Sequence, residues 1–370
     1  MVDCEKKSKR ERTMKLNEYL EGIEPVDQSA MEAAEKYWDT RTHPIGSLGK
    51  LEEMTIRLAG IQGTPIPSLA KKTTIVMCSD NGVVAEDISS SPQIFTQMLA
   101  NAMARGETGV AALSRHVGAD LRIVDMGMLK TLEREEYIID CVIREGSGNI
   151  AVENAMTREE ALKAIEAGIT VTEEEIKNGC SILGTGELGI GNTTTSSALL
   201  AAITSASLED CVGYGAGISE KQYEKKLHVV RKAMERLSPK RDIIDTLAAL
   251  GGFDIAGIVG VFIAGAYYGI PVVVDGLISG AAALVAIKLN ESVRDYVFTS
   301  HRSSEKASDV LYRALKMEPS LDLAMRLGEG SGCPLFFQLL ETAIGCMIGM
   351  GSIEDNAIDP NRLVNLRGKK

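Results

Sequence analysis

The clearest pattern along the chain is a short apolar run, followed by a loop of small polar residues and then by an amphipathic helix. The apolar runs occur at residues 73–82, 120–127, 180–189, 271–276 and 295–303. Short apolar runs that alternate with helical segments are typical of parallel strands joined by right-handed crossovers. The pattern therefore predicts an α/β fold with a doubly wound, mostly parallel sheet of the Rossmann-like kind.

Helical patterns mark the segments before and between these runs. Residues 157–169 have the sequence TREEALKAIEAGI, in which Thr157 and Glu160 have the spacing of a capping box with Thr157 as N-cap. Residues 16–62 are also predicted to be helical, with a Gly-Ser turn at residues 43–50 between two stretches.

One uncharged stretch, residues 256–274, is long enough to raise the question of a membrane span. Gly269 and Pro271 interrupt it, and Asp275 closes it. Because a parallel sheet needs fully buried strands, we expect a buried helix here, then a glycine at its C-terminus, then the buried strand PVVVD.

Composition and charge narrow the classes of function. The net charge is −11 and aromatic residues make up only 4%, so neither nucleic acid nor an anionic membrane surface is an expected partner. The basic cluster KKSKRER at residues 6–12 is interpreted as part of a disordered tail over residues 1–15. The seven cysteines form no CxxC pair and the four histidines have no ligand spacing, which favours a reducing cytoplasm and predicts no metal site.

The loops that follow parallel strands emerge at one edge of the sheet, and ligands bind in the crevice there. The sequence places the loops SDNG, DMG, GTGELGIGN, DGLIS and TSHRS after the predicted strands. We therefore expect these loops to converge, although they lie far apart in the sequence.

The stretch GTGELGIGNTTTSSALL, residues 184–200, carries the most specific chemical signal among these loops. Gly184, Gly186 and Gly189 have the spacing of a dinucleotide-binding turn. That turn also requires an acidic residue about twenty positions further on to hold a ribose. The candidate, Asp210, follows a polar run and ends no clear strand. A dinucleotide site, as in an NAD-dependent dehydrogenase, therefore stays an alternative.

A helix predicted to start near Asn192 offers a second interpretation. Gly186, Gly189 and Gly191 let the backbone approach a ligand closely. The first N–H groups of the helix and the hydroxyls of residues 193–195 would point at an anion, and a single phosphate fits better than a pyrophosphate. Asparagine and threonine also cap helices without binding anything, so the residues alone leave both interpretations open.

The segment GELGIGNTTTSSALL resembles the signature of nicotinate-nucleotide:dimethylbenzimidazole phosphoribosyltransferases, which make the lower-ligand nucleotide of cobamides. Similar segments follow in the order of that family, at residues 38–62, 79–93, 273–284, 299–305 and 326–332. The resemblance implies a large α/β catalytic domain over residues 66–335. It also implies a small helical domain built from residues 16–65 and 336–370.

The same resemblance implies an activity. Members of the family move 5-phosphoribose from nicotinate mononucleotide to a nitrogen of 5,6-dimethylbenzimidazole, release nicotinate and invert the anomeric centre. The expected enzyme uses no metal or other cofactor, has no membrane span and forms a homodimer. A paralogue that has lost the activity and kept only the phosphate loop is a further alternative.

The family's functional residues can be carried over to positions in this chain. Glu329, in GEGSG at residues 328–332, is implied to be the general base, although the residues alone also allow a solvated loop carboxylate. A carboxylate in that place can take the proton that the attacking azole nitrogen must lose. Lys226, which the pattern alone would make an exposed helix charge, is implied to contact the nucleotide. The implied nucleotide-binding set is Glu187, Leu188, Gly189, Gly191, Asn192, Thr193, Gly215, Lys226 and Leu327.

The residues implied to surround the aromatic acceptor are Asp80, Ser90, Ser91 and Met98. The family often has an aromatic residue where this chain has Ser91, and a family glutamine falls at Met98, with Gln97 displaced by one position. These departures from the family concern the acceptor and not the type of reaction. Relatives that activate phenol or p-cresol, some of them heterodimers of two paralogues, supply the alternative function.

Overall fold

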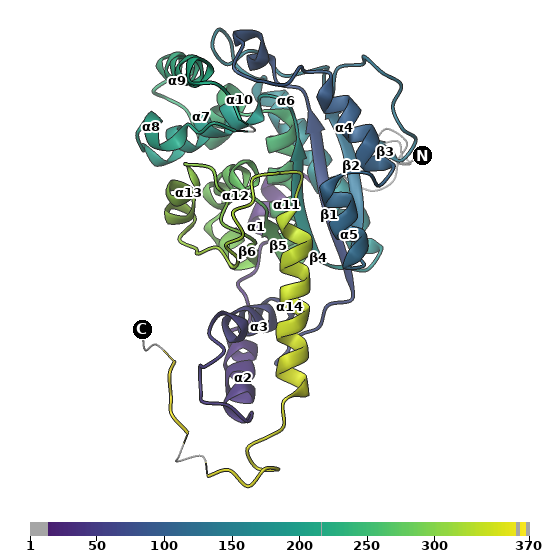
Figure 1. Ribbon diagram of the computed structural model, residues 1–370, viewed down its shortest axis with the longest axis vertical. Helices are drawn as coiled ribbons and strands as arrows, with labels where there is room; N and C mark the ends of the chain where they lie inside the picture. The colour runs from purple at the N-terminus through teal and green to yellow at the C-terminus, as the bar shows by residue number, and fades with distance from the viewer. Residues whose placement is uncertain (1–13, 216, 360–362, 368–370) are drawn as a thin grey trace.

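A computed structural model describes residues 14–215, 217–359 and 363–367 (Figure 1). Its sheet has the order β3-β2-β1-β4-β5-β6, and every neighbouring pair of strands is parallel. The strands are β1 (Lys71–Ser79), β2 (Asp120–Gly127), β3 (Ile138–Asp140), β4 (Cys180–Leu188), β5 (Val272–Val274) and β6 (Val297–Thr299). The prediction of a doubly wound parallel sheet is confirmed. Most of the predicted tail lies outside the described residues, which begin at residue 14.

Five of the six strands coincide with the predicted apolar runs, and β3 was missed. It has only three residues and lies at the edge of the sheet, where only Ile138 is buried. So short and so exposed a strand has no apolar run to reveal it.

Helices cover both faces of the sheet (Figure 1). Their bounds are α1 (Leu16–Glu21), α2 (Gln28–Asp39), α3 (Lys50–Gln62), α4 (Phe95–Ala104), α5 (Gly109–His116), α6 (Arg158–Lys177), α7 (Asn192–Thr204), α8 (Leu208–Cys211), α9 (Glu220–Glu235), α10 (Ile243–Leu250), α11 (Phe253–Tyr267), α12 (Leu277–Leu289), α13 (Ser308–Leu315) and α14 (Gly332–Gly349), with 3-10 turns η1 (Gly82–Glu86) and η2 (Glu291–Tyr296). The capping box of α6 is confirmed, because the Glu160 N–H donates to the Thr157 hydroxyl and the Thr157 N–H donates to the Glu160 carboxylate.

Alternate residues of β1 pack into different apolar clusters. Ile75 and Met77 belong to the large core that includes α6, α11 and α12, whereas Val76 and Cys78 pack with α4 and α5. This alternation follows from the period of two along a strand. It shows why a central strand of a doubly wound sheet is apolar throughout.

The uncharged stretch around residues 256–274 forms the predicted buried elements. α11 is buried along nearly its whole length, Gly269 adopts a positive φ of 67° just after it, and the buried β5 follows. Within the described residues, α14 is the helix long and apolar enough to cross a membrane by length and composition. Half of it is buried inside the fold, as in the core helix of a soluble protein.

The lower end of the molecule is helical. α14 extends from the sheet to α2 and α3 (Figure 1), and Ala34, Trp38, Ala59 and Met347 form a separate buried cluster there. α1, in contrast, packs its Leu16 and Tyr19 into the large core. The division into domains over residues 16–65 with 336–370 and over 66–335 stays a prediction.

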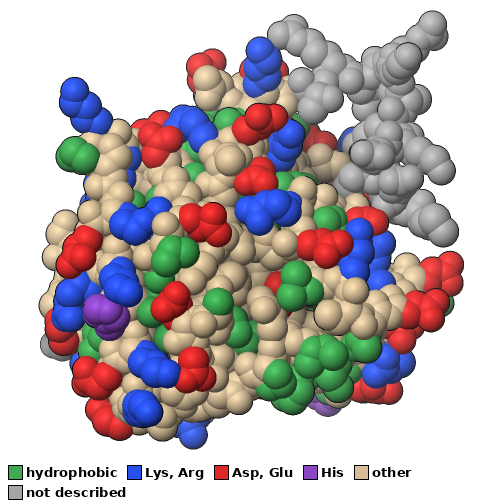
Figure 2. Space-filling view, turned by 90° about the horizontal axis from the view of Figure 1, so that it is seen from above, with side chains coloured by type: hydrophobic (Ala, Val, Ile, Leu, Met, Phe, Trp, Pro, Cys, Tyr) green, Lys and Arg blue, Asp and Glu red, His purple; other side chains and the backbone are tan. Residues whose placement is uncertain are grey.

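Apolar side chains gather at one edge of the face that Figure 2 shows, on the side where α4 lies in Figure 1. The exposed large apolar residues on and beside α4 are Ile94, Phe95, Met98 and Leu99. Leu327, which packs over the start of α5, is 56% exposed. An apolar group of this kind on a soluble protein is typical of an interaction surface.

Helices α6 and α11 pack closely against each other through glycines. A Cβ added at Gly260 would overlap the carbonyl oxygen of Ile165, and one added at Gly168 would overlap that of Gly257. These glycines therefore let the two helix backbones touch directly, which brings α11 down onto the sheet.

We expect Gly260→Ala to lower the free energy of unfolding by about 1–3 kcal/mol, because the added methyl group must separate two packed helices. Gly345→Ala is the matched control, since Gly345 is an exposed glycine of α14 with no atom within 4 Å of an added Cβ. The control should be neutral or gain up to about 1 kcal/mol from helix propensity. Urea unfolding curves that coincide for Gly260→Ala and the parent would contradict the proposed tight contact.

Candidate active site

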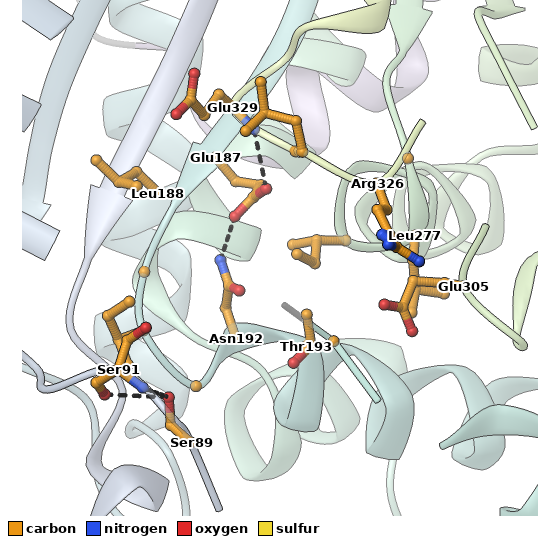
Figure 3. Close-up of a pocket in the computed structure, with 18 of the residues that line it drawn as sticks. Ser89, Ser91, Glu187, Leu188, Asn192, Thr193, Leu277, Glu305, Arg326 and Glu329 are labelled. Carbon is orange, nitrogen blue, oxygen red and sulfur yellow. Dashed lines mark hydrogen bonds between the residues drawn. The ribbon is translucent and has the colours of Figure 1, made fainter. Parts of the chain in front are cut away.

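The loops after the strands enclose a cavity of about 310 Å³ at the edge where the predicted loops were expected to converge (Figure 3). Its walls come from the segment after β4, the loops after β5 and β6, the loop before α14, and residues 88–95. The neighbouring strands β1 and β4 connect onward in opposite directions across the sheet, so the cavity lies at the topological switch point. It is therefore the expected place for a ligand.

The glycines of the predicted turn have a different role from the one that a dinucleotide site requires. Gly184 and Gly186 lie inside β4, not in a turn. A Cβ on Gly184 would be 2.6 Å from the Cβ of Cys333, and one on Gly186 would overlap the carbonyl oxygen of Glu329. Because these two glycines have no side chains, the loop before α14 can lie directly on β4. Asp210 is exposed in α8, so the dinucleotide alternative has no support here.

Helix α7 begins at Asn192, as predicted, after Gly191 in the left-handed region with a φ of 96°. The Asn192 side chain does not cap the helix. Its amide donates to a Glu187 carboxylate oxygen and, at 3.0 Å, to Asp254 Oδ2. The N–H groups of Asn192 and Thr194 donate to carbonyls of the turn, so they are not free for an anion. The capping interpretation and the expectation of free N–H groups at these two positions are both wrong.

A buried ammonium group lies beside the start of α7. The Lys226 side chain is 2% exposed, and its Nζ donates to Thr193 Oγ1 at 3.1 Å and to the Gly213 carbonyl at 3.0 Å. Burial lowers the pKa of Lys226 to about 8, and the Glu305 carboxylate opposes this shift. Gly215 adopts a φ of 57° beside Thr193 and completes this corner of the cavity, which we call the Lys226 corner.

The pattern-only view of Lys226 as an exposed helix charge is wrong. In α9 the side chain lies on the same buried face as Tyr223, Leu227 and Val230, at helical spacings of three and four residues. A lysine on the apolar stripe of an amphipathic helix was the available signal for its burial.

Glu187 and Asp275 are buried carboxylates that line the cavity, and the buried Asp254 contacts Asn192 without lining it. Burial raises the pKa of Glu187, and the Asn192 amide opposes that shift. Burial also raises the pKa values of Asp254 and Asp275 to about 7 each. Sequence reasoning did not assign roles to these two aspartates. In the sequence, each of these aspartates is a single acidic residue at the edge of a long apolar run. A carboxylate that is buried with such a run requires hydrogen-bond partners, and this could have indicated a role.

The loop that carries Glu329 has an unusual backbone. Gly328, Glu329 and Gly330 have positive φ values of 78°, 64° and 90°, and a glutamate in this region is strained. The Glu329 N–H donates to Glu187 Oε1 at 3.4 Å. Asp275 accepts the N–H groups of Gly330 at 3.2 Å and Gly332 at 2.7 Å. The ends of β4 and β5 thus hold the strained loop.

The Glu329 carboxylate lies 8% exposed against the start of α5. Its Oε2 accepts the Val110 N–H at 3.1 Å. Burial raises the pKa of Glu329, and the bond from Val110 opposes the rise. Glu187 contacts both Asn192 and the Glu329 backbone, so the predicted base and the predicted nucleotide loop meet at one carboxylate (Figure 3).

The end of the cavity away from the Lys226 corner is lined by apolar side chains and by serine hydroxyls. Ser90 and Ser91 line it together with Leu188, Phe95 and Leu99. The Ser89 hydroxyl bonds to the Ser91 backbone and shapes this loop. No aromatic side chain stands at the Ser91 position, as the sequence had indicated.

Two predicted acceptor residues do not reach the cavity. The Asp80 carboxylate is buried away from it and accepts the Leu129 N–H at 2.8 Å. Met98 is 46% exposed and does not line the cavity, because Phe95 and Leu99, one turn apart, form the side of α4 that faces it. The side-chain amide of the neighbouring Gln97 donates to the Leu132 carbonyl and accepts the Leu132 N–H, so it points away from the cavity lining.

The remaining predicted residues lie together around the cavity. They are Ser90, Ser91, Glu187, Leu188, Gly189, Gly191, Asn192, Thr193, Gly215, Lys226, Leu327 and Glu329. The described residues contain no group of three or more His, Cys, Asp or Glu side chains arranged to hold a metal ion.

Comparisons with known proteins identify the family. A family profile described as "Phosphoribosyltransferase" matches residues 23–358. The Clostridium acetobutylicum protein named nicotinate-nucleotide–dimethylbenzimidazole phosphoribosyltransferase is 41% identical over 348 residues, which is 94% of this chain and 99% of its own. The protein of the same name from Clostridium tetani is 42% identical over 356 residues, 96% of this chain and 98% of its own.

Solved structures show the same fold. The crystal structure of CobT from Thermus thermophilus superposes with a TM-score of 0.86 at 33% identity, covering 90% of this chain and 99% of that one. A second structure from the same organism, titled as the nicotinate-nucleotide–dimethylbenzimidazole phosphoribosyltransferase, has a TM-score of 0.85 at 32% identity with the same coverage.

The Lys226 corner predicts pH-dependent binding of a phosphate monoester. The ammonium must be charged to attract the anion, so affinity for ribose 5-phosphate should fall as the pH rises through about 8. Lys226→Met should weaken binding by about 1.5–3 kcal/mol at pH 7 and remove this pH dependence. Titration calorimetry between about pH 7 and 9.5 measures both, above the phosphate's own second pKa of about 6.

Lys225→Met is the matched control, because Lys225 is the next residue of α9 and its ammonium pairs with Asp87 on the surface. It should keep the parent's affinity and pH dependence. An unchanged pH slope in Lys226→Met would remove Lys226 from the anion site.

Proposed function

Because this chain belongs to the phosphoribosyltransferase family whose profile spans residues 23–358, we propose that it transfers 5-phosphoribose from nicotinate mononucleotide to 5,6-dimethylbenzimidazole. The products are the α-ribotide and nicotinate, and the ribotide supplies the lower ligand of a cobamide. The observation that carries this assignment to the cavity is the position of Glu187, whose carboxylate contacts both Asn192 and the Glu329 backbone.

In this proposal the nucleotide lies between Asn192 and the Lys226 corner. The Lys226 ammonium and the Thr193 hydroxyl, which are 3.1 Å apart, bind the phosphate as charge-assisted donors. Glu187 accepts from the ribose hydroxyls and lies close to the anomeric carbon, where positive charge develops as nicotinate leaves. A buried carboxylate stabilises such a charge better than one in water, because the local dielectric constant is lower.

The acceptor lies at the apolar end, between Leu188, Phe95 and Ser90. The bond from the anomeric carbon to the pyridinium nitrogen breaks, and its electron pair leaves with nicotinate. The acceptor nitrogen attacks the opposite face of the same carbon and forms the new bond. The proton on the other azole nitrogen passes to Glu329, whose pKa burial has raised toward the working pH.

We also propose a homodimer in the cytoplasm, without nucleic-acid or membrane partners. Phe95, Leu99 and Leu327 line the cavity and are partly exposed, and these apolar side chains support an interface there. Cys78, Cys180, Cys211, Cys333 and Cys346 are free thiols, which suits a reducing compartment. A heterodimer with a paralogue stays the alternative assembly.

Glu329→Gln is expected to lower kcat roughly 10²–10⁴-fold, because the amide cannot take the proton. The fold should be kept, since Gln still offers an oxygen to the Val110 N–H. Turnover of nicotinate mononucleotide with dimethylbenzimidazole, followed by chromatography, measures the loss. Glu136→Gln, at an exposed glutamate outside the cavity lining, is the control. A kcat near that of the parent would remove Glu329 from the mechanism.

The serines at the acceptor end favour testing a second class of acceptor. Ser90 and Ser91 offer hydroxyls where an aromatic wall would select a flat bicyclic base. We expect mass spectrometry to detect the ribotide of dimethylbenzimidazole when both this base and p-cresol are offered with nicotinate mononucleotide. A product from p-cresol alone would replace the proposed acceptor and leave the donor unchanged.

A further inference from the structure

We propose that the backbone N–H of Val110, at the start of α5, is a positioning group for the Glu329 carboxylate. It fixes Oε2 and leaves Oε1 as the oxygen that takes the acceptor's proton. The inference rests on the proposed function, in which Glu329 is the base. It gives a role in that function to residues 108–110, for which the sequence analysis predicted none.

The hydrogen bond itself is the first observation. Glu329 Oε2 accepts the Val110 N–H at 3.1 Å across 219 residues of sequence. Glu329 also lines the cavity. The two oxygens of its carboxylate are thus distinguished, because Oε2 is the one that accepts the backbone N–H of Val110.

The second observation is that the start of α5 lacks a cap of its own. Thr108 is the N-cap residue, yet its side chain makes no capping bond. Its hydroxyl is buried and lies near the Glu329 carboxylate, whose pKa it lowers. The first N–H groups of a helix have no acceptor within the helix. The Glu329 carboxylate supplies that acceptor from a distant loop, and the helix dipole favours its negative charge.

The third observation is the space left by Gly109. A Cβ at this position would be 2.5 Å from Leu327 Cδ2 and 3.5 Å from Glu329 Oε2. A glycine at the first position of α5 therefore lets both the loop and the carboxylate reach the helix. Two features therefore make this contact possible. One is the strained loop that carries Glu329, and the other is the missing side chain at Gly109.

The bond has a consequence for the ionisation of Glu329. Burial raises the pKa of this carboxylate, and the Val110 N–H, followed by the Thr108 hydroxyl and the Gly109 N–H, opposes the rise. The charged groups around Glu329 on the other packed elements are Glu187 at the end of β4 and Asp275 after β5, and both are acidic. Without the Val110 donor, burial would raise the pKa of Glu329 further and leave less of the base ionised.

Val110→Pro tests the bond directly, because proline removes the N–H in the first turn, where no bond within the helix is lost. The acid limb of the pH profile of kcat/KM for the acceptor should move up by about one to two pH units, since a bond to a charged group is lost. Activity should recover at higher pH, and KM for nicotinate mononucleotide should not change. Val110→Ala is the matched control, because it shortens the same buried side chain and keeps the N–H.

Thr108→Asn tests the same bond without proline. An asparagine N-cap accepts the N–H groups of the second and third helix residues, so it competes with Glu329 for Val110. We expect an upward shift of the acid limb with an unchanged or higher melting temperature. Thr108→Val is the matched control, because it removes the hydroxyl and cannot cap, and it should shift the limb less. If Val110→Pro does not fold, this pair of variants decides the question.

The outcomes separate the two proposals. No ribotide from nicotinate mononucleotide and dimethylbenzimidazole with the parent protein overturns the proposed function, and full turnover in Glu329→Gln removes Glu329 as its base. Loss of turnover in Glu329→Gln, together with an unmoved acid limb in Thr108→Asn and in folded Val110→Pro, overturns the positioning role alone. A fall in kcat/KM that is equal at every pH and is shared by Val110→Ala would also overturn it, because only packing would then be involved.

Discussion

The hydrogen bonds of Glu187 are the interaction on which the geometry of the cavity depends. One carboxylate oxygen accepts the Asn192 amide and the other accepts the Glu329 N–H, 142 residues further along the chain. Burial raises the pKa of this carboxylate, so its charge is stabilised only by these donors. Because a buried carboxylate requires partners, it draws the start of α7 and the loop before α14 together at the end of β4.

The approach of that loop to the sheet depends on glycines. Gly184 and Gly186 lack side chains where Cys333 and the Glu329 carbonyl lie on β4. Asp275 then accepts two N–H groups from the other side. These contacts hold Glu329 in a backbone conformation that an isolated chain would avoid. The loop is therefore positioned by three elements, the ends of β4 and β5 and the start of α5.

Much of the fold was predictable because it follows from local pattern. The apolar runs located β1, β2, β4, β5 and β6, and the capping pair Thr157 and Glu160 located the start of α6. β3 escaped because three residues at an edge carry too little pattern. In the site, the recognisable segments led to Glu187, Asn192 and Glu329. Met98 was misplaced because the side of α4 that faces the cavity depends on how the helix is rotated against the sheet.

Hydrophobic periodicity and the order of short motifs were thus sufficient for the class of fold, the edge of the sheet that binds ligands and the family. They were not sufficient for the states and partners of the charged groups. Whether Lys226 is exposed or buried, and whether Asn192 caps its helix or bridges two carboxylates, depends on neighbours from distant segments. The same holds for Val110, whose N–H meets Glu329 only after the chain has folded. Burial and hydrogen bonding depend on how distant segments pack together. The distances between residues of such segments cannot be obtained from the local sequence pattern.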